Sequence, residues 1–263
     1  MGATARILGF SIISALTMAF PGHAADAAEI RVFSANGVKQ IMGDLAPRFE
    51  QTTGLTLIVS YGEAGELRHR ILDNEGFDLA FLPAQTLRDL ATLGKIAAGS
   101  MVDIALTEVG MAVRAGALKP DTSSADAFKR SLLAAASIAI TDPASGGVSG
   151  VHFAGVLQRL GIAEAVEPRL RLTRGVFNAE LVARGEVEMA VQLAHEIRSV
   201  EGVDFVALPP EFQRSIVFSA GLAAAAHEPA EARAGASELI AFLSARGAAP
   251  MIIARGMEPA AGK

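Results

Sequence analysis

The chain has 263 residues, of which 19% are charged and 51% are hydrophobic, a balance that excludes a disordered protein. The formal net charge of −5, without any run of lysine or arginine, argues against nucleic-acid binding. Cysteine is absent, which excludes disulfides and thiolate chemistry, and the five scattered histidines show no metal-ligand spacing, so we expect no metal and no other cofactor.

The N-terminus has the layout of a secretory signal peptide. Arg6 supplies the positive charge, an apolar stretch runs over residues 7–20, and small residues from Ala24 to Ala27 offer a cleavage point. The alternative is a short membrane anchor, but the apolar stretch is too short for a comfortable span. We therefore expect residues 1–25 to be removed during export to the periplasm, a compartment that suits a chain without disulfides.

The following part of the chain alternates strands with helices. Runs of β-forming residues predict the strands, and apolar residues at helical spacing predict the helices. The expected strands are 30–34, 55–61 and 77–82, and the expected helices are 38–53, 67–72 and 87–93.

The alternation resumes after a longer strand at 104–113. The expected helices are 128–135, 151–160, 180–184 and 228–246, and the expected strands are 137–141, 170–172, 189–193, 203–208 and 216–220. This order predicts an α/β fold of mixed, mostly parallel sheets. We expect one lobe from residues 26–105 plus 221–263 and another from 106–220, joined by crossing strands near 104–114 and 216–222. Ligands of such folds lie in the cleft beyond the carboxyl ends of the strands.

Three loops join a strand to a helix start in a way that suits anion binding. The free N–H groups of a first helical turn point outward, and the helix dipole favours negative charge there. The loop Asp142–Gly150 is the clearest case, because it has more glycine and serine than a turn needs. We expect Ser145, Ser149 and Gly150 to contact a ligand.

The loops Ser34–Val38 and Gly62–Gly65 follow the first and second strands in the same way. The alternative interpretation of Ser34–Val38 is an ordinary helix cap made by the side chain of Asn36. The alternative interpretation of Gly62–Gly65 is a plain turn between a strand and a helix. In the functional interpretation, hydroxyl, amide and backbone N–H groups from both loops hold an anion. The expected contacts are Ser34, Asn36, Gly37, Val38, Ala64 and Gly65.

Several other polar residues lie near these loops, and each has a functional and a structural interpretation. Gln192 interrupts an apolar strand, and its place at the strand end favours the cleft over a purely structural role. Glu63 and His152 are the candidates for a catalytic base, although a solvated acid at a helix start and a half-buried structural histidine are the favoured interpretations. Arg68, His195 and Glu196 are expected on the surface. No hydrolase elbow, P-loop or dinucleotide fingerprint occurs.

The order and spacing of several segments resemble those of periplasmic type II solute-binding proteins, in particular the molybdate-binding branch. These segments are 30–38, 50–54, 60–67, 76–84, 142–143, 184–188 and 241–244. The resemblance implies a two-lobed fold that closes like a hinge on a solute and delivers it to the membrane permease of an ABC importer. It also implies a monomer as the default state.

The chain departs from the molybdate-binding pattern at three positions. Gly37, Ala64 and Leu193 stand where those proteins place hydroxyl side chains. We therefore expect a small organic carboxylate in preference to a molybdate-like oxyanion. A periplasmic aconitate isomerase is also similar to this branch, which leaves open a second function, an allylic proton shift between trans- and cis-aconitate. That reaction needs carboxylate clamps, with Ser34, Ser149 and Arg68 as candidates, and one base.

Overall fold

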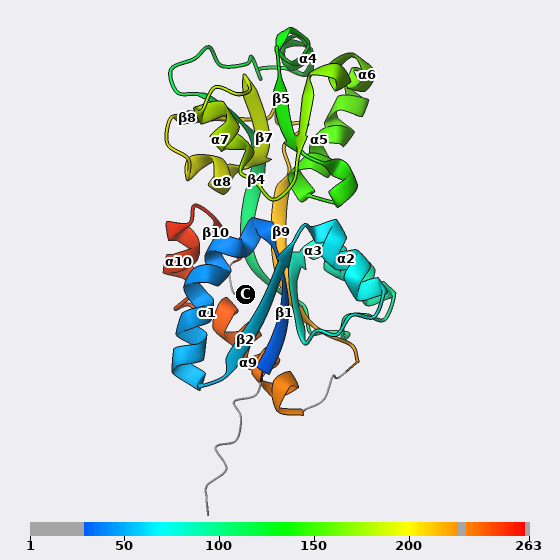
Figure 1. Cartoon of the computed structure of the whole chain (residues 1–263), viewed down its shortest axis with the longest axis vertical. Helices are drawn as coiled ribbons and strands as arrows, with labels where there is room; N and C mark the ends of the chain where they lie inside the picture. Colours follow the sequence, from blue (N-terminus) through cyan, green and yellow to red (C-terminus); the bar gives the residue numbers. More distant parts are fainter. Residues whose placement is uncertain (1–28, 226–229, 261–263) are drawn as a thin grey trace, which may run out of the picture.

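A computed structural model describes residues 29–225 and 230–260, so the expected signal peptide lies outside the described residues. Two lobes are stacked along the long axis of the molecule and are connected by two strands (Figure 1). Within the described ranges every helix is too short or too polar to span a membrane.

The lower lobe in Figure 1 is a mixed sheet with helices on its faces. Its parallel strands follow the order β2-β1-β3, after which β9 and β4 continue the sheet antiparallel and β10 pairs with β4. The strands are β1 (Glu29–Ala35), β2 (Thr56–Gly62), β3 (Leu79–Pro83), β4 (Val102–Arg114), β9 (Ser215–Leu222) and β10 (Glu258–Pro259). The helices are η1 (Asn36–Val38), α1 (Lys39–Thr53), α2 (Ala64–Leu72), α3 (Ala84–Thr92), α9 (Ala230–Ser244) and α10 (Ala249–Ala254).

The upper lobe has the strand order β4-β7-β5-β6, with β8 also paired to β4. Its strands are β5 (Ile138–Thr141), β6 (Leu170–Thr173), β7 (Met189–Leu193) and β8 (Val203–Ala207). Its helices are α4 (Ala125–Ala134), η2 (Pro143–Ser145), α5 (Val148–Arg159), α6 (Ala163–Val166), η3 (Glu167–Arg169), α7 (Asn178–Ala183) and α8 (Ala194–Arg198).

Strand β4 belongs to both sheets. Up to Glu108 it pairs with β9 of the lower lobe, and from Val109 onward it pairs with β7, while β8 joins it from Gly110. The chain therefore crosses between the lobes on β4 and returns on β9, which confirms the two-lobed α/β class with two crossing strands. The exact lobe boundaries stay a prediction.

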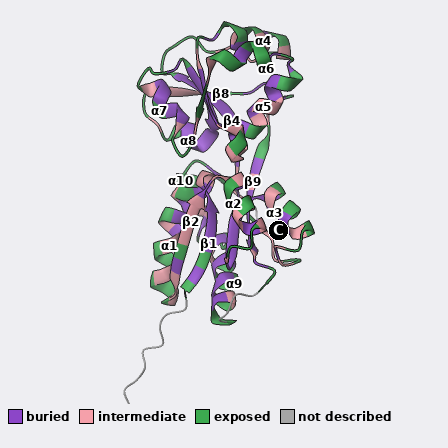
Figure 2. Cartoon of the chain, turned by 45° about the vertical axis from the view of Figure 1, so that its right-hand side comes forward, coloured by how far each residue is buried: buried purple, intermediate pink, exposed green. Residues whose placement is uncertain are grey.

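Both lobes have a buried interior, and most of the central strands are buried in Figure 2. Phe49 and Phe81 are fully buried in the lower lobe, as are Phe128 and Phe153 in the upper lobe. Burial of one such side chain contributes about 1.5–3 kcal/mol. The apolar faces of the helices and the apolar runs of the strands thus form the core together.

Helices α2, α3, α4, α5 and α7 begin two or three residues earlier than the sequence predicts, and two of these differences concern the cleft. Helix α2 begins at Ala64 instead of residue 67, and α5 begins at Val148 instead of residue 151. The first three residues of these helices include Gly65 and Glu66 in α2 and Ser149 and Gly150 in α5, which interrupt the apolar spacing from which the helices were predicted. The short elements α6, α8 and β10 and the 3-10 helices η1, η2 and η3 were not expected.

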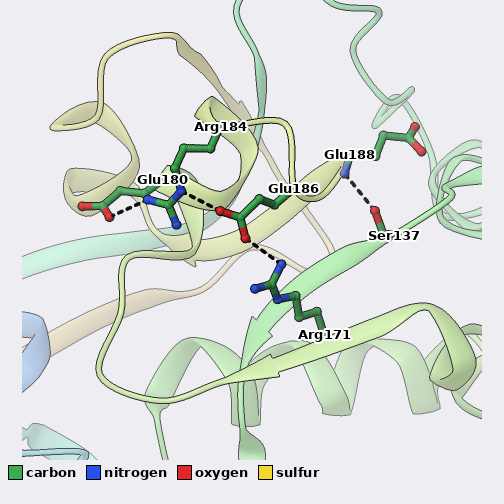
Figure 3. Close-up of polar contacts among 6 residues, drawn as sticks. All are labelled: Ser137, Arg171, Glu180, Arg184, Glu186 and Glu188. Atoms are coloured by element: carbon green, nitrogen blue, oxygen red, sulfur yellow. Dashed lines mark hydrogen bonds and ion pairs between the residues drawn. The ribbon is translucent and has the colours of Figure 1, made fainter.

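The segment Arg184–Glu188, which carries part of the family resemblance, has a structural role (Figure 3). The Arg184 guanidinium lies 3.3 Å from Glu180 and 2.7 Å from Glu186, and Glu186 also accepts a hydrogen bond of 2.9 Å from Arg171. These exposed ion pairs join α7 to β6 at the edge of the upper lobe.

Candidate functional site

The two lobes enclose a cavity of about 640 Å³ where the carboxyl ends of several strands meet. The lower lobe contributes the turns after β1 and β2, and the upper lobe contributes the end of β5, the start of α5 and the junction of β7 with α8. We call this space the interlobe cavity. Its volume suits a small organic ligand.

Three helix starts reach the interlobe cavity without a side-chain cap. They are the first residues of η1, α2 and α5, where none of the residues before the helix hydrogen-bonds the first-turn amides through its side chain. First-turn N–H groups that no side chain satisfies are donors for a negatively charged ligand. The repeated anion-binding loops of the sequence therefore do converge in space.

Six of the candidate residues line the interlobe cavity together. They are Asn36, Gly37, Glu63, Ala64, Ser149 and Gln192. Thr141, at the end of β5, also lines the cavity and was not a candidate.

The other candidates lie elsewhere. Ser34 is fully buried inside β1, and its hydroxyl has no hydrogen-bond partner among the described residues. Val38 is a core residue, and Ser145 donates its hydroxyl to the Asp142 carbonyl at 2.7 Å. Gly150 packs directly against the Thr141 backbone, where a side chain would clash.

Gly65 and His152 occupy positions beside the interlobe cavity. Gly65 lies against Gly146 of the upper lobe, and a Cβ on it would come within 2.6 Å of the Gly146 Cα. His152 is half-buried on another side of the cleft, where its Nε2 lies 2.8 Å from the Phe212 carbonyl oxygen. Arg68 is partly buried on α2 and does not line the cavity.

Gln192 serves the fold and faces the cavity at once. Its side-chain oxygen accepts a hydrogen bond of 3.1 Å from the Ala179 N–H and so caps α7. This fixes the amide orientation and leaves the nitrogen as donor, and the side chain hydrogen-bonds the Glu196 carboxyl. The cap was unforeseen, because it joins residues from different elements.

The expectation that Glu196 lies on the surface is wrong, because this residue is 7% exposed and lines the cavity. Burial raises the pKa of Glu196 to about 8, and the negative charge of Glu63 adds to the effect. Glu196 is therefore a protonated acid at neutral pH. Glu63 accepts a hydrogen bond of 3.1 Å from the Asn36 amide, so the two lobes place two different carboxyl groups at one cavity.

The expectation of a surface position is wrong for His195 as well, since it is 3% exposed. Its Nδ1 lies 3.1 Å from the Thr107 hydroxyl of β4, and its ring hydrogen-bonds the Gly37 backbone. Burial lowers the pKa of His195 to about 4, so the ring is neutral and structural. It fixes the first anion-binding turn against the crossing strand.

The cations at the interlobe cavity are few. Arg255 forms a two-pronged ion pair with Asp44, with both N–O distances at 2.7 Å, so its charge is compensated. Lys39 is exposed at the cavity and lies 5.3 Å from the centre of the Tyr61 ring. Among the described residues, no group of three or more histidine, aspartate or glutamate side chains could hold a metal ion.

A family model described as Bacterial extracellular solute-binding protein matches residues 30–258. The protein is 31% identical over 237 residues to a protein of Pseudomonas sp named aconitate isomerase, and this match covers 88% of the chain and 87% of that protein.

Solved structures with the same fold include two anion receptors. The Azotobacter vinelandii periplasmic molybdate-binding protein is 19% identical with a TM-score of 0.69, covering 89% of this chain and 100% of that one. The sulfate-binding protein of Mycobacterium tuberculosis is 16% identical with a TM-score of 0.69, covering 89% and 87%.

Proposed function

The chain belongs to the bacterial extracellular solute-binding protein family, and from that premise we propose that it isomerises a small unsaturated polycarboxylate, aconitate, in the interlobe cavity. The observation that carries this proposal is the pair of carboxyl groups. A receptor that only holds an anion gains nothing from two carboxyl groups in its wall, whereas proton transfer needs an acid and a base of different pKa.

The environments of the two groups suit these separate roles. Glu196 is buried and protonated, whereas Glu63 is half-buried at the start of α2 and accepts the Asn36 hydrogen bond. A buried, protonated carboxylic acid donates a strong hydrogen bond to developing negative charge. Glu63 is the base in this assignment, and Gln192 orients Glu196 through the α7 cap.

The reaction balances without a cofactor. The base takes a proton from the methylene carbon of aconitate, and the electron pair moves into the allylic system as the double bond shifts. The proton is then returned to the former vinylic carbon, so substrate and product have the same atoms and charge. The hydrogen bond from Glu196 stabilises the carboxylate that carries the intermediate's extra charge.

The carboxylates of the substrate have donors available on both lobes. The uncapped starts of η1, α2 and α5 supply backbone amides, and Ser149 and Lys39 add a hydroxyl and a positive charge. This set differs from a cage of hydroxyl groups around a tetrahedral oxyanion, because Gly37 and Ala64 contribute only backbone there. It supports a planar carboxylate over molybdate.

The test incubates the purified protein with trans-aconitate and measures cis-aconitate by chromatography. We expect turnover above the buffer blank, and a loss of about a hundredfold or more in Glu196→Gln and Glu63→Gln. The exposed Glu201→Gln is the matched control and retains the rate. A folded wild-type protein whose rate equals the blank would reject the isomerase.

A second candidate function rests on the family and fold: an exported, monomeric receptor that captures the same class of anion for the permease of an ABC importer. The residues from the two lobes that line one cavity, and the contact between Gly65 and Gly146, support it. Thermal-shift measurements against di- and tricarboxylates, molybdate and sulfate separate the two candidates. Strong stabilisation by one anion without turnover favours the receptor, and no stabilisation by any anion rejects it.

A further inference from the structure

A second hollow, of about 490 Å³, lies between α3, α5 and β9. Three arginines line it, Arg88 from α3, Arg159 from α5 and Arg214 just before β9, and we call it the arginine groove. None of the residues found to line it carries a carboxylate. The groove is therefore strongly positive on a chain whose net charge is −5.

The arginine charges are free of compensating partners. In the described part of the chain, the ion pairs found involve none of these three side chains. Arg159 is held in place by a hydrogen bond of 3.1 Å to the Glu211 carbonyl and lies 4.7 Å from the centre of the Phe212 ring. Its position is thus fixed by neutral contacts that leave its charge uncompensated.

His152 lines the same groove as Arg159 and Arg214. Its pKa is lowered first by burial and further by the charges of Arg214 and Arg159, although its hydrogen bond to the Phe212 backbone acts in the opposite direction. Arg159, Arg214 and His152 thus line one space, where both arginine charges would act on a bound anion.

The interlobe cavity has fewer uncompensated positive charges in its wall than the arginine groove. Arg255 is paired with Asp44 there, and the wall holds Glu63 and Glu196. The two spaces adjoin, because Ala64, Pro83 and Val148 line both. A polyanion that approaches this cleft meets three arginines without an ion pair in the groove, whereas in the cavity Lys39 is the one lining cation that forms no ion pair among the described residues.

We propose that the arginine groove is a second anion-binding site, which takes a small polycarboxylate beside the interlobe cavity. Two or three carboxylates match the arginine forks better than one, because each fork forms paired hydrogen bonds with a carboxylate. This site goes beyond the proposed function, since binding in the groove requires no turnover. Because its arginines are exposed, its affinity falls with ionic strength.

The test titrates the purified protein with tricarballylate, a saturated tricarboxylate, by isothermal titration calorimetry at low ionic strength. We expect two equivalents to bind to the wild type. The weaker one is lost or weakened by about tenfold in Arg214→Gln and in the Arg159→Gln/Arg214→Gln double variant, and it also weakens with added salt. Arg246→Gln, an exposed arginine outside the groove, is the matched control and retains both equivalents.

A single equivalent in the wild type, or a second equivalent that both groove variants retain, would overturn the proposal. Failure of the isomerase is distinguishable, because it appears as absent cis-aconitate while the second equivalent and its dependence on Arg214 persist. Circular dichroism of the variants verifies that they are folded. The single variant keeps the test valid if the double variant does not fold.

Discussion

Gly65 and Gly146 touch backbone to backbone across the cleft, one from the start of α2 and one from the loop before α5. A Cβ on Gly65 would lie 2.6 Å from the Gly146 Cα and 2.7 Å from the Ser145 carbonyl oxygen. Both atoms belong to the backbone, which cannot rotate away as a side chain can. The contact between the lobes at this point therefore requires glycine.

Gly65→Ala should oppose lobe closure without unfolding either lobe. We expect its affinity for trans-aconitate to fall by about tenfold or more, because the closed form becomes a minor state. Calorimetric titration measures this change. Gly247→Ala, where a Cβ meets nothing within 4 Å, is the control, and equal affinities of the two variants would contradict the requirement for glycine.

Gly185→Ala should destabilise the upper lobe by about 1–2 kcal/mol, because Gly185 has a φ of 72° that favours glycine. A Cβ would also meet the Arg114 guanidinium, the far end of a flexible side chain that can move. Gly161→Ala shares the left-handed backbone, at φ 65°, without a neighbour within 4 Å. Urea unfolding should give similar losses, and a much larger loss for Gly185→Ala would show that Arg114 cannot move.

Glu196 should make the protein less stable as the pH rises. Its pKa is raised from 4.5 to about 8 in the folded state, so the folded chain binds more protons than the unfolded chain between these values. The stabilisation is fully present below pH 4.5 and is lost progressively as the pH rises to 8. Glu196→Gln should remove this slope, a difference on the order of a few kcal/mol. Urea unfolding from pH 5 to 8 measures it, with Glu201→Gln as control; identical slopes in wild type and Glu196→Gln would contradict the shift.

His195 should act in the opposite direction over a more acidic range. Its pKa is lowered from 6.5 to about 4, so the unfolded chain binds the extra proton and stability falls as the pH drops from 6.5 to 4. We expect His195→Gln to flatten this part of the profile by about 1–3 kcal/mol. Exposed His69→Gln serves as the comparison in the same unfolding series, and it should leave the slope unchanged.

The sequence predicts the strands well because their burial is local information. Met189–Leu193 has the predicted bounds, and the apolar run of β1 fixes that strand to within one residue at each end. Helix starts are harder, since Gly65 in the first turn of α2, and Ser149 and Gly150 in that of α5, interrupt the apolar spacing. Glycine and serine mark the three strand-to-helix loops directly, and the structure brings residues of all three to the interlobe cavity, while their binding of an anion stays a prediction.

The acid at the centre of the site could not be found in this way. Glu196 lies in the five-residue helix α8, where it is buried, hydrogen-bonds Gln192 of β7 and is affected by the charge of Glu63 from the other lobe. Ser34 is the opposite case. Its hydroxyl near a strand end predicted a ligand contact, but β1 lies between β2 and β3, and Ser34 is buried there. Only contacts between distant segments decide both cases.

The link from His195 to Thr107 and Gly37 has a consequence for opening and closing. A rotation about the crossing strands moves atoms in proportion to their distance from the axis, and His195 is bonded to β4, one of those strands. Glu196 follows it directly in the chain, so in a rotation of this kind it would move less than residues far from the crossing strands. Gly65 and Gly146, which lie outside the crossing strands, separate when the cleft opens. The position of the Glu196 carboxyl would therefore depend little on whether the cleft is open or closed, whereas the contact between Gly65 and Gly146 would form only in the closed protein.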